Sequence, residues 1–189
     1  MLNFFSKSIL KLSGWQLNVN LPEEKKFILI GAPHTSNWDF PLAMLVFWTL
    51  DLKIYWVGKI QMFRGPLKIF FTALGGIPVD RNSSHGFINQ IAEKFNQTEE
   101  MVLTISPEGT RSKTKYWKSG FYYIALAAKV PICMGYIDYK TQKLGFEKLL
   151  YPTGNIEADM GIIADFYNNI QGKLSQNQGL VRVKTSSKS

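Results

Sequence analysis

The chain has 189 residues, of which 46% are hydrophobic and 19% charged, a balance that excludes a disordered protein and indicates one globular domain with its own core. A net charge of +8 indicates an anionic partner: nucleic acid, a phosphorylated small molecule or an anionic membrane surface. One cysteine excludes an internal disulfide, and one cysteine with two histidines leaves too few ligands for a zinc site. We expect neither a transmembrane span nor a secretory signal, because polar residues interrupt every apolar run before it reaches the roughly 18 to 20 residues that spanning requires.

The N-terminal residues 1–14 have the pattern of a short amphipathic helix. Aromatic and aliphatic residues recur at helical spacing beside Lys7 and Lys11, and Gly14 ends the pattern. Such a helix can lie on a bilayer with its lysines attracted to anionic lipid, or it can pack on the core of the domain. The sequence leaves both possibilities open. We therefore set residues 1–20 apart as a candidate membrane-surface helix with its lead-in.

The middle of the chain alternates short apolar runs with longer apolar or amphipathic segments. The short runs predict strands at 26–30, 53–57, 101–105, 130–139 and 144–150. The longer segments predict helices at 40–50, 67–74, from 83 or 84 to 96, 120–129, and from 155 or 157 to 170. This order indicates an α/β domain, for which we take residues 21–172. The remainder, 173–189, is polar with lysines and predicts a flexible tail.

A histidine and an acid lie where the first of these strands joins its helix, which is where α/β proteins commonly place their chemistry. Residues five apart on a regular helix point about 140° apart, so His34 and Asp39 can meet only if the chain bends between them. A proline and two hydroxyl residues favour such a bend, and Ser36 is a natural N-cap. If the side chains meet, Asp39 can hold one tautomer of His34 and leave the other ring nitrogen as a general base. Ser36 and Asp39 also fit a capping box, in which the negative charge of Asp39 only interacts with the positive end of the helix dipole.

Two later loops carry residues suited to an anion. The sequence GGIPVDR at 75–81 allows close backbone approach and ends in Arg81, which can capture a phosphate through two parallel hydrogen bonds. A surface pair between Arg81 and Asp80 explains this segment equally well. The strand at 101–105 leads into SPEGTRS at 106–112, a tight loop with an acid, an arginine and three lysines close behind. We interpret it as a binding loop.

Four of these segments resemble, in order and spacing, the sequence blocks of the glycerophospholipid acyltransferase family, which includes the bacterial 1-acyl-glycerol-3-phosphate acyltransferases. They are the H-x4-D pattern at 34–39, GGIPVDR at 75–81, SPEGTRS at 106–112 and VPI at 130–132. The resemblance covers about half of the chain and implies a single domain with a central mixed, mostly parallel sheet flanked by helices. There are two departures: Pro33 stands where relatives commonly have Asn, and many relatives have longer N-terminal membrane anchors.

The family transfers a fatty acyl group from acyl-CoA or acyl carrier protein to a hydroxyl of a glycerophosphate-type acceptor, without an acyl-enzyme. The resemblance implies that His34 is the general base and that Asp39 orients and charge-balances its imidazole. It implies acceptor binding by Arg81, Glu108, Gly109, Thr110 and Arg111, with the two arginines on the phosphate, and less directly by Lys59. No cofactor is expected beyond the thioester co-substrate. For the oxyanion of the tetrahedral intermediate we expect donors among the amides at the start of the helix after Ser36.

The reaction we expect is acyl transfer to a lysophospholipid, with 1-acyl-sn-glycerol-3-phosphate as the first candidate, by a peripheral protein at the cytoplasmic face of an anionic membrane. A catalytically silent lipid-binding protein of the same fold is the alternative, but the intact His34, Asp39, Glu108 and Arg111 argue against it. A nucleic-acid binder is suggested by the charge and by the basic segment 113–118. The basic residues there cluster beside the predicted binding loops and form no recognised module, so we expect no nucleic-acid partner.

Overall fold

The computed structural model describes the backbone of residues 2–79 and 84–184, with the side chains of these residues other than Lys59, Met62, Val79, Ser84 and His85. The strands are β1 (Gln16–Val19), β2 (Lys26–Gly31), β3 (Ile54–Lys59), β4 (Gly76–Val79), β5 (Met101–Ile105), β6 (Ile132–Asp138) and β7 (Lys143–Leu150). They form a seven-stranded sheet in the order β1-β7-β6-β2-β5-β3-β4. Neighbours are parallel except for β6 and β7, which are antiparallel. The predicted mixed, mostly parallel sheet is confirmed.

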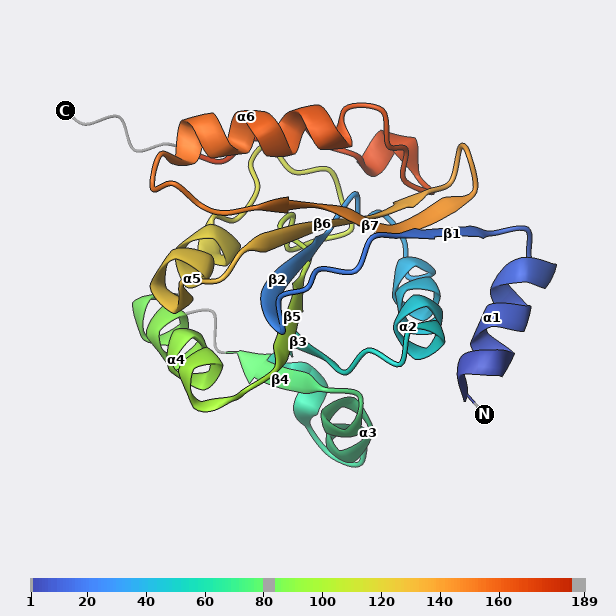
Figure 1. Cartoon of the computed structure of the whole chain (residues 1–189), viewed down its shortest axis with the longest axis horizontal. Helices are drawn as coiled ribbons and strands as arrows, with labels where there is room; N and C mark the ends of the chain where they lie inside the picture. Colours follow the sequence, from blue (N-terminus) through green and yellow to red (C-terminus); the bar gives the residue numbers. More distant parts are fainter. Residues whose placement is uncertain (1, 80–83, 185–189) are drawn as a thin grey trace.

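Helices cover both faces of this sheet. They are α1 (Leu2–Leu12), α2 (Asp39–Thr49), α3 (Leu67–Ala73), α4 (Ser84–Gln97), α5 (Gly120–Ala128) and α6 (Ile156–Tyr167), with the 3-10 turns η1 (Ile60–Phe63) and η2 (Ser175–Asn177). Figure 1 shows α1 and α2 on one side of the central strands and α4 and α5 on the other. The flanking helices are those that the alternating sequence pattern predicts, and their ends differ from the prediction by a few residues at most.

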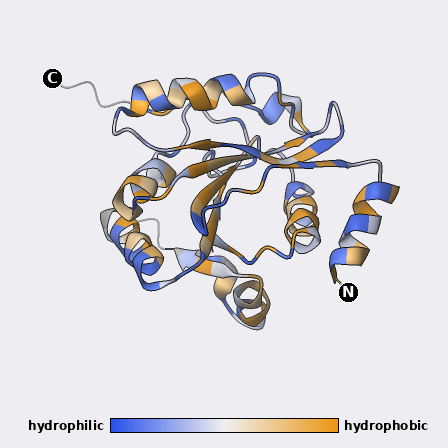
Figure 2. Ribbon diagram, in the orientation of Figure 1, coloured by the Kyte–Doolittle hydropathy of each residue, from blue (hydrophilic) through white to orange (hydrophobic). Residues whose placement is uncertain are grey.

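Strand β2 separates two hydrophobic cores, because successive side chains of a strand point to opposite faces. Ile28 and Ile30 belong to the core built with α4, α5 and α6, whereas Phe27 and Leu29 belong to the core built with α1, α2 and η1. All four side chains are buried, as expected of a strand with parallel neighbours on both edges and helices on both faces. Figure 2 shows the hydrophobic residues that run along these central strands.

The N-terminal segment packs on the domain through one helix face. Leu10 is buried in the core on the α2 side, and the Asn3 side chain donates a hydrogen bond to the carbonyl of Thr49 at the end of α2. The other face of α1 leaves large apolar side chains 49–88% exposed: Leu2, Phe4, Phe5, Ile9 and Leu12. Sequence analysis missed β1, which pairs with β7 at the edge of the sheet, because its alternating, partly exposed residues form no apolar run.

Part of the segment predicted as a flexible tail, 173–189, packs on the domain. Residues 173–184 lie against the domain, and residues 185–189 are outside the described part of the chain. The backbone of Trp117 donates to the carbonyl of Arg182 at 2.7 Å, and Val183 is buried beside Trp117. Polar composition hid this packing, because the segment attaches through only a few apolar side chains and backbone hydrogen bonds.

Candidate active site

Three parallel neighbours in the sheet, β5, β2 and β6, end at the same edge, and the loops that follow them form the candidate site. The loop 32–38 follows β2, the loop 106–119 follows β5, and the turn 139–142 follows β6. Loops at the carboxyl ends of parallel strands are where open α/β sheets bind ligands. The topology therefore collects side chains that are far apart in the sequence.

His34 and Asp39 meet across the bend between β2 and α2. The ring Nδ1 of His34 lies 3.1 Å from Oδ2 of Asp39, and the two side chains are 25% and 6% exposed. The same oxygen accepts hydrogen bonds from the backbone amides of Thr35 and Ser36, each at 2.9 Å. The Asp39 carboxylate thus holds the backbone of the bend through two hydrogen bonds and also contacts the imidazole. One side chain thus makes both contacts that the sequence left as alternatives, the one with the backbone of the turn and the one with the imidazole.

The start of α2 differs in detail from the prediction. Trp38 occupies the N-cap position instead of Ser36, whose hydroxyl accepts a hydrogen bond from the Trp38 amide at 3.2 Å. The Asp39 amide donates to the carbonyl of Ser36 at 3.4 Å. Two of the amides expected to bind an oxyanion are therefore already used in the turn. This arrangement corrects both the predicted cap and, for these two amides, the predicted oxyanion donors.

Tyr139 is a third member of the cluster, and sequence analysis missed it. Its hydroxyl donates a hydrogen bond of 2.8 Å to Oδ1 of Asp39, the carboxylate oxygen that faces away from the imidazole. Burial alone would raise the pKa of Asp39, but the hydrogen bonds from His34, the Ser36 amide and Tyr139 outweigh it and lower the pKa below its usual value. Asp39 is therefore held as a carboxylate that accepts from the imidazole.

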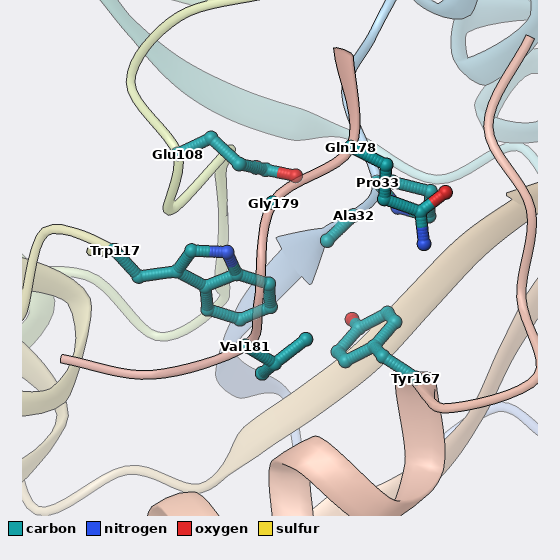
Figure 3. Close-up of a pocket in the computed structure, with 8 residues that line it drawn as sticks. All are labelled: Ala32, Pro33, Glu108, Trp117, Tyr167, Gln178, Gly179 and Val181. Carbon is teal, nitrogen blue, oxygen red and sulfur yellow. The ribbon is translucent and has the colours of Figure 1, made fainter. Parts of the chain in front are cut away.

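Glu108 contacts the loop 32–38 that carries His34. Its Oε1 accepts a hydrogen bond of 2.9 Å from the backbone amide of His34, and the residue is 8% exposed. Its Oε2 has no hydrogen-bond partner among the described residues, and Glu108 lines a cavity with room for about one water molecule. Figure 3 shows the residues that line it: Ala32, Pro33, Glu108, Trp117, Tyr167, Gln178, Gly179 and Val181. Burial raises the pKa of Glu108, only partly offset by the His34 amide. The observed contact holds the His34 backbone; contact with substrate stays a prediction.

The other predicted binding residues are placed unevenly. Arg111 is exposed and donates a hydrogen bond to the side chain of Asn37, which brings its guanidinium beside the His34 loop. Thr110 accepts a hydrogen bond from the amide of Ser112 at 3.2 Å, and Gly109 has a φ of +65°, which glycine adopts without strain.

Two further predicted contacts are not described at the level of side chains. Lys59 is the last residue of β3, at the edge where the site lies, but its side chain is outside the described part. Arg81 also lies outside the described residues. One basic residue that sequence analysis did not single out is close by: Lys173, whose Nζ lies 5.0 Å from the centre of the Trp38 ring and 5.9 Å from that of Tyr139.

Comparisons with known proteins show which family the chain matches. The sequence matches the model of the acyltransferase family over residues 16–137. It is 28% identical over 128 residues to 1-acyl-sn-glycerol-3-phosphate acyltransferase of Escherichia coli strain K12, a match that covers 62% of this chain and 49% of that protein. The chain thus spans about half the length of this curated relative. The crystal structure of the 1-acyl-sn-glycerophosphate (LPA) acyltransferase PlsC from Thermotoga maritima has the same fold, with a TM-score of 0.62 at 15% identity, over 89% of this chain and 77% of that one.

Proposed function

The chain belongs to the acyltransferase family, and from that premise we propose that it moves a fatty acyl group from a thioester to the free hydroxyl of a lysophospholipid. The first candidate acceptor is 1-acyl-sn-glycerol-3-phosphate, the substrate named for the curated relative, and the donor is acyl-CoA or acyl carrier protein. The observation that carries the proposal is the contact of 3.1 Å between His34 and Asp39, inside the segment that matches the family.

In the proposed reaction His34 acts as a general base. With Nδ1–H donating a hydrogen bond to Asp39, the Nε2 nitrogen is unprotonated and can accept the proton of the acceptor hydroxyl. The hydroxyl oxygen forms a bond to the thioester carbonyl carbon as its proton moves to Nε2, which gives a tetrahedral oxyanion, and the carbon–sulfur bond breaks as the carbonyl re-forms. The thiolate leaves and takes the proton from the imidazolium. A base positioned in this way typically contributes about 10²- to 10⁴-fold.

The transfer is proposed to be direct and to use no cofactor, only side chains and the two substrates. The cysteine thiol is no candidate for an acyl carrier, because Cys133 is fully buried in β6 and burial raises its pKa to about 12. Arg111, beside Asn37 of the loop 32–38, is proposed to bind the acceptor phosphate together with Arg81, as the resemblance implies. A guanidinium suits this task because it can donate two parallel hydrogen bonds to phosphate oxygens.

Peripheral attachment to an anionic membrane is proposed from two exposed apolar helix faces. The outer face of α1 carries five exposed apolar side chains, and Lys7 and Lys11 lie on the same helix. On α3, Leu67, Ile69 and Phe70 are 56–78% exposed. Within residues 2–79 and 84–184, no helix has both the length and the apolar character needed to cross a bilayer. Apolar side chains inserted at the headgroup level and lysines drawn to anionic lipid supply such attachment without a span. The cytoplasmic face is proposed because the thioester donors occur there.

Vesicle sedimentation tests the attachment. Phe4→Ser with Leu12→Ser should weaken binding to vesicles that contain anionic lipid, because the double variant removes two of the exposed apolar side chains. The matched control is Leu180→Ser, which removes a side chain that is 66% exposed on the segment after α6. Equal binding by both variants and wild type would contradict attachment through α1.

The function is tested by offering the purified protein mixed lysolipids and mixed thioester donors and identifying the lipid products by mass spectrometry. Acylated product should form with wild type and fall at least a hundredfold with His34→Ala. His85→Ala, the same substitution at the other histidine of the chain, is the control and should keep full activity. Binding of lysolipid without transfer from any donor would point to the silent lipid-binding alternative instead.

A further inference from the structure

The two oxygens of the Asp39 carboxylate have different partners. Oδ2 accepts from His34 and from two backbone amides, and these three donors lie in the six residues that lead into α2. Oδ1 accepts from the hydroxyl of Tyr139, which comes from the turn after β6. The first three contacts are local and position the carboxylate along the bend. The fourth ties it to a different strand and limits rotation of the carboxylate plane.

Tyr139 is itself held in place by contacts that do not involve Asp39. Its amide donates to the carbonyl of Gln171 at 2.9 Å, and the neighbouring Asp138 carboxylate accepts from the amides of Lys140 and Gln171, each at 3.1 Å. The ring of Trp15 meets the Tyr139 ring edge to face, with centroids 5.1 Å apart. The hydroxyl is thus presented to Asp39 by a rigid support.

We propose that Tyr139 is a positioning residue that acts on His34 through Asp39. The hydroxyl keeps Oδ2 directed at Nδ1 and takes up part of the carboxylate charge, which sets how strongly Asp39 holds a proton on the imidazole. The effect on turnover rests on the proposed function, whereas the effect on the imidazole does not. Tyr139 lies two residues beyond the segment 16–137 that matches the family, so the matched segment does not contain it.

The charged and titratable groups around this chain of contacts come from four elements. His34 and Asp39 flank the bend, Glu108 comes from the loop after β5, Asp138 precedes Tyr139, and Lys173 lies over the Tyr139 ring. Burial and the neighbouring carboxylate of Asp39 raise the pKa of Tyr139, so the phenol stays protonated and donates throughout the working pH range. Removing the hydroxyl therefore changes one donor and no net charge.

The test is Tyr139→Phe, compared with Tyr136→Phe as a matched control. Tyr136 is on the adjoining strand β6, and its hydroxyl also donates to a carboxylate, that of Glu147, away from Asp39. The chain has two histidines, so the ring signals of the histidine NMR spectrum are readily assigned with His34→Ala. In Tyr139→Phe, Oδ1 of Asp39 loses its donor and the proton on Nδ1 is shared more strongly with Oδ2, so the Nδ1–H resonance of His34 should move downfield. In Tyr136→Phe it should not move.

Turnover is measured on the same variants. Tyr139→Phe should lower kcat about threefold to tenfold, with KM for the acceptor nearly unchanged and the acid limb of the pH profile moved upward. Tyr136→Phe should leave all three unchanged, although this variant also loses hydrogen bonds of a tyrosine hydroxyl, the one donated to Glu147 and the one accepted from Asn18. If the Nδ1–H resonance of His34 does not move in Tyr139→Phe, the proposal is overturned, whether or not the protein transfers acyl groups. A moved resonance with unchanged kcat overturns the role in catalysis, and wild type without transfer overturns the proposed function alone.

Discussion

Replacing Asp39 by Asn removes one charge and keeps the shape of the side chain. The amides of Thr35 and Ser36 both point at the Oδ2 position, so the oxygen of the new carboxamide should take that place and its NH2 group should face Tyr139. The new side chain can still accept a hydrogen bond from Nδ1 of His34, so the tautomer is kept. What Asp39→Asn loses is the negative charge opposite the imidazolium that forms as the hydroxyl proton moves.

The size of this loss follows from the geometry. Charge centres about 4 Å apart attract by roughly 4 kcal/mol at an effective dielectric constant of about 20. The neutral hydrogen bond that the carboxamide still makes with the imidazole offsets about 1 kcal/mol of the lost attraction. The remainder, about 3 kcal/mol, corresponds to a fall in kcat of about 10²-fold. His34 is 25% exposed, so solvent screening makes this an upper value.

The assay is the initial rate of acyl transfer at saturating donor and acceptor, with Asp159→Asn as the control. Asp159 is also a buried carboxylate that accepts from a tyrosine hydroxyl and a backbone amide, but it lies on α6, and its partners are Tyr122 and Thr153. Asp159→Asn should lower thermal stability and leave kcat within about threefold of wild type. A kcat of Asp39→Asn that is also within about threefold of wild type would refute the electrostatic role of Asp39.

Four further predictions concern stability. Glu108→Gln keeps an acceptor for the His34 amide and avoids ionisation, whereas Glu108→Ala leaves that amide unpaired and should cost about 1–3 kcal/mol by chemical denaturation. Burial raises the pKa of Glu108 above 4.5, and Glu108→Gln cannot ionise. The free energy of unfolding of wild type should therefore fall relative to that of Glu108→Gln as the pH rises from 4.5 through the folded-state pKa. Parallel curves of unfolding free energy against pH for the two proteins would argue against this. The lowered pKa of Asp39 stabilises the fold above pH 3.8, and this contribution should be lost as the pH falls below that value through the folded-state pKa, a loss absent from Asp39→Asn. Ending the chain after Gly172 should lower the melting temperature relative to the full chain, because Val183 is buried and pairs with Trp117; equal melting temperatures would show that the segment contributes nothing.

The parts of the fold that could be predicted are those with local causes. Apolar runs at strand or helix spacing predicted the central strands and the flanking helices, and the contact between His34 and Asp39 was predictable because only five residues and one bend separate them. The contacts of Glu108 and Tyr139 were not. Their partners lie 74 and 100 residues away, and only the placement of β2 between β5 and β6 brings the three loops together.

The segments that sequence analysis missed are held by contacts with distant parts of the chain, and their own hydrophobic pattern does not mark them as ordered elements. β1 forms because β7 offers it an edge to pair with, and residues 173–184 are ordered by contacts such as that between the Leu174 amide and the Thr35 hydroxyl, at 3.2 Å. Neither segment has the continuous apolar run that marks a buried element. Short edge elements of this kind follow from the tertiary structure, so composition alone predicted a lead-in and a flexible tail.

The central claim is that the imidazole of His34 removes the proton from the acceptor hydroxyl. The most direct measurement is the ratio of the acyl-transfer rates of His34→Ala and His85→Ala on one lysophospholipid and one thioester donor. We predict a ratio of about 10⁻² to 10⁻⁴, with both variants folded by circular dichroism. A ratio near one would contradict the account, because the reaction would then proceed without the base on which the proposed mechanism depends.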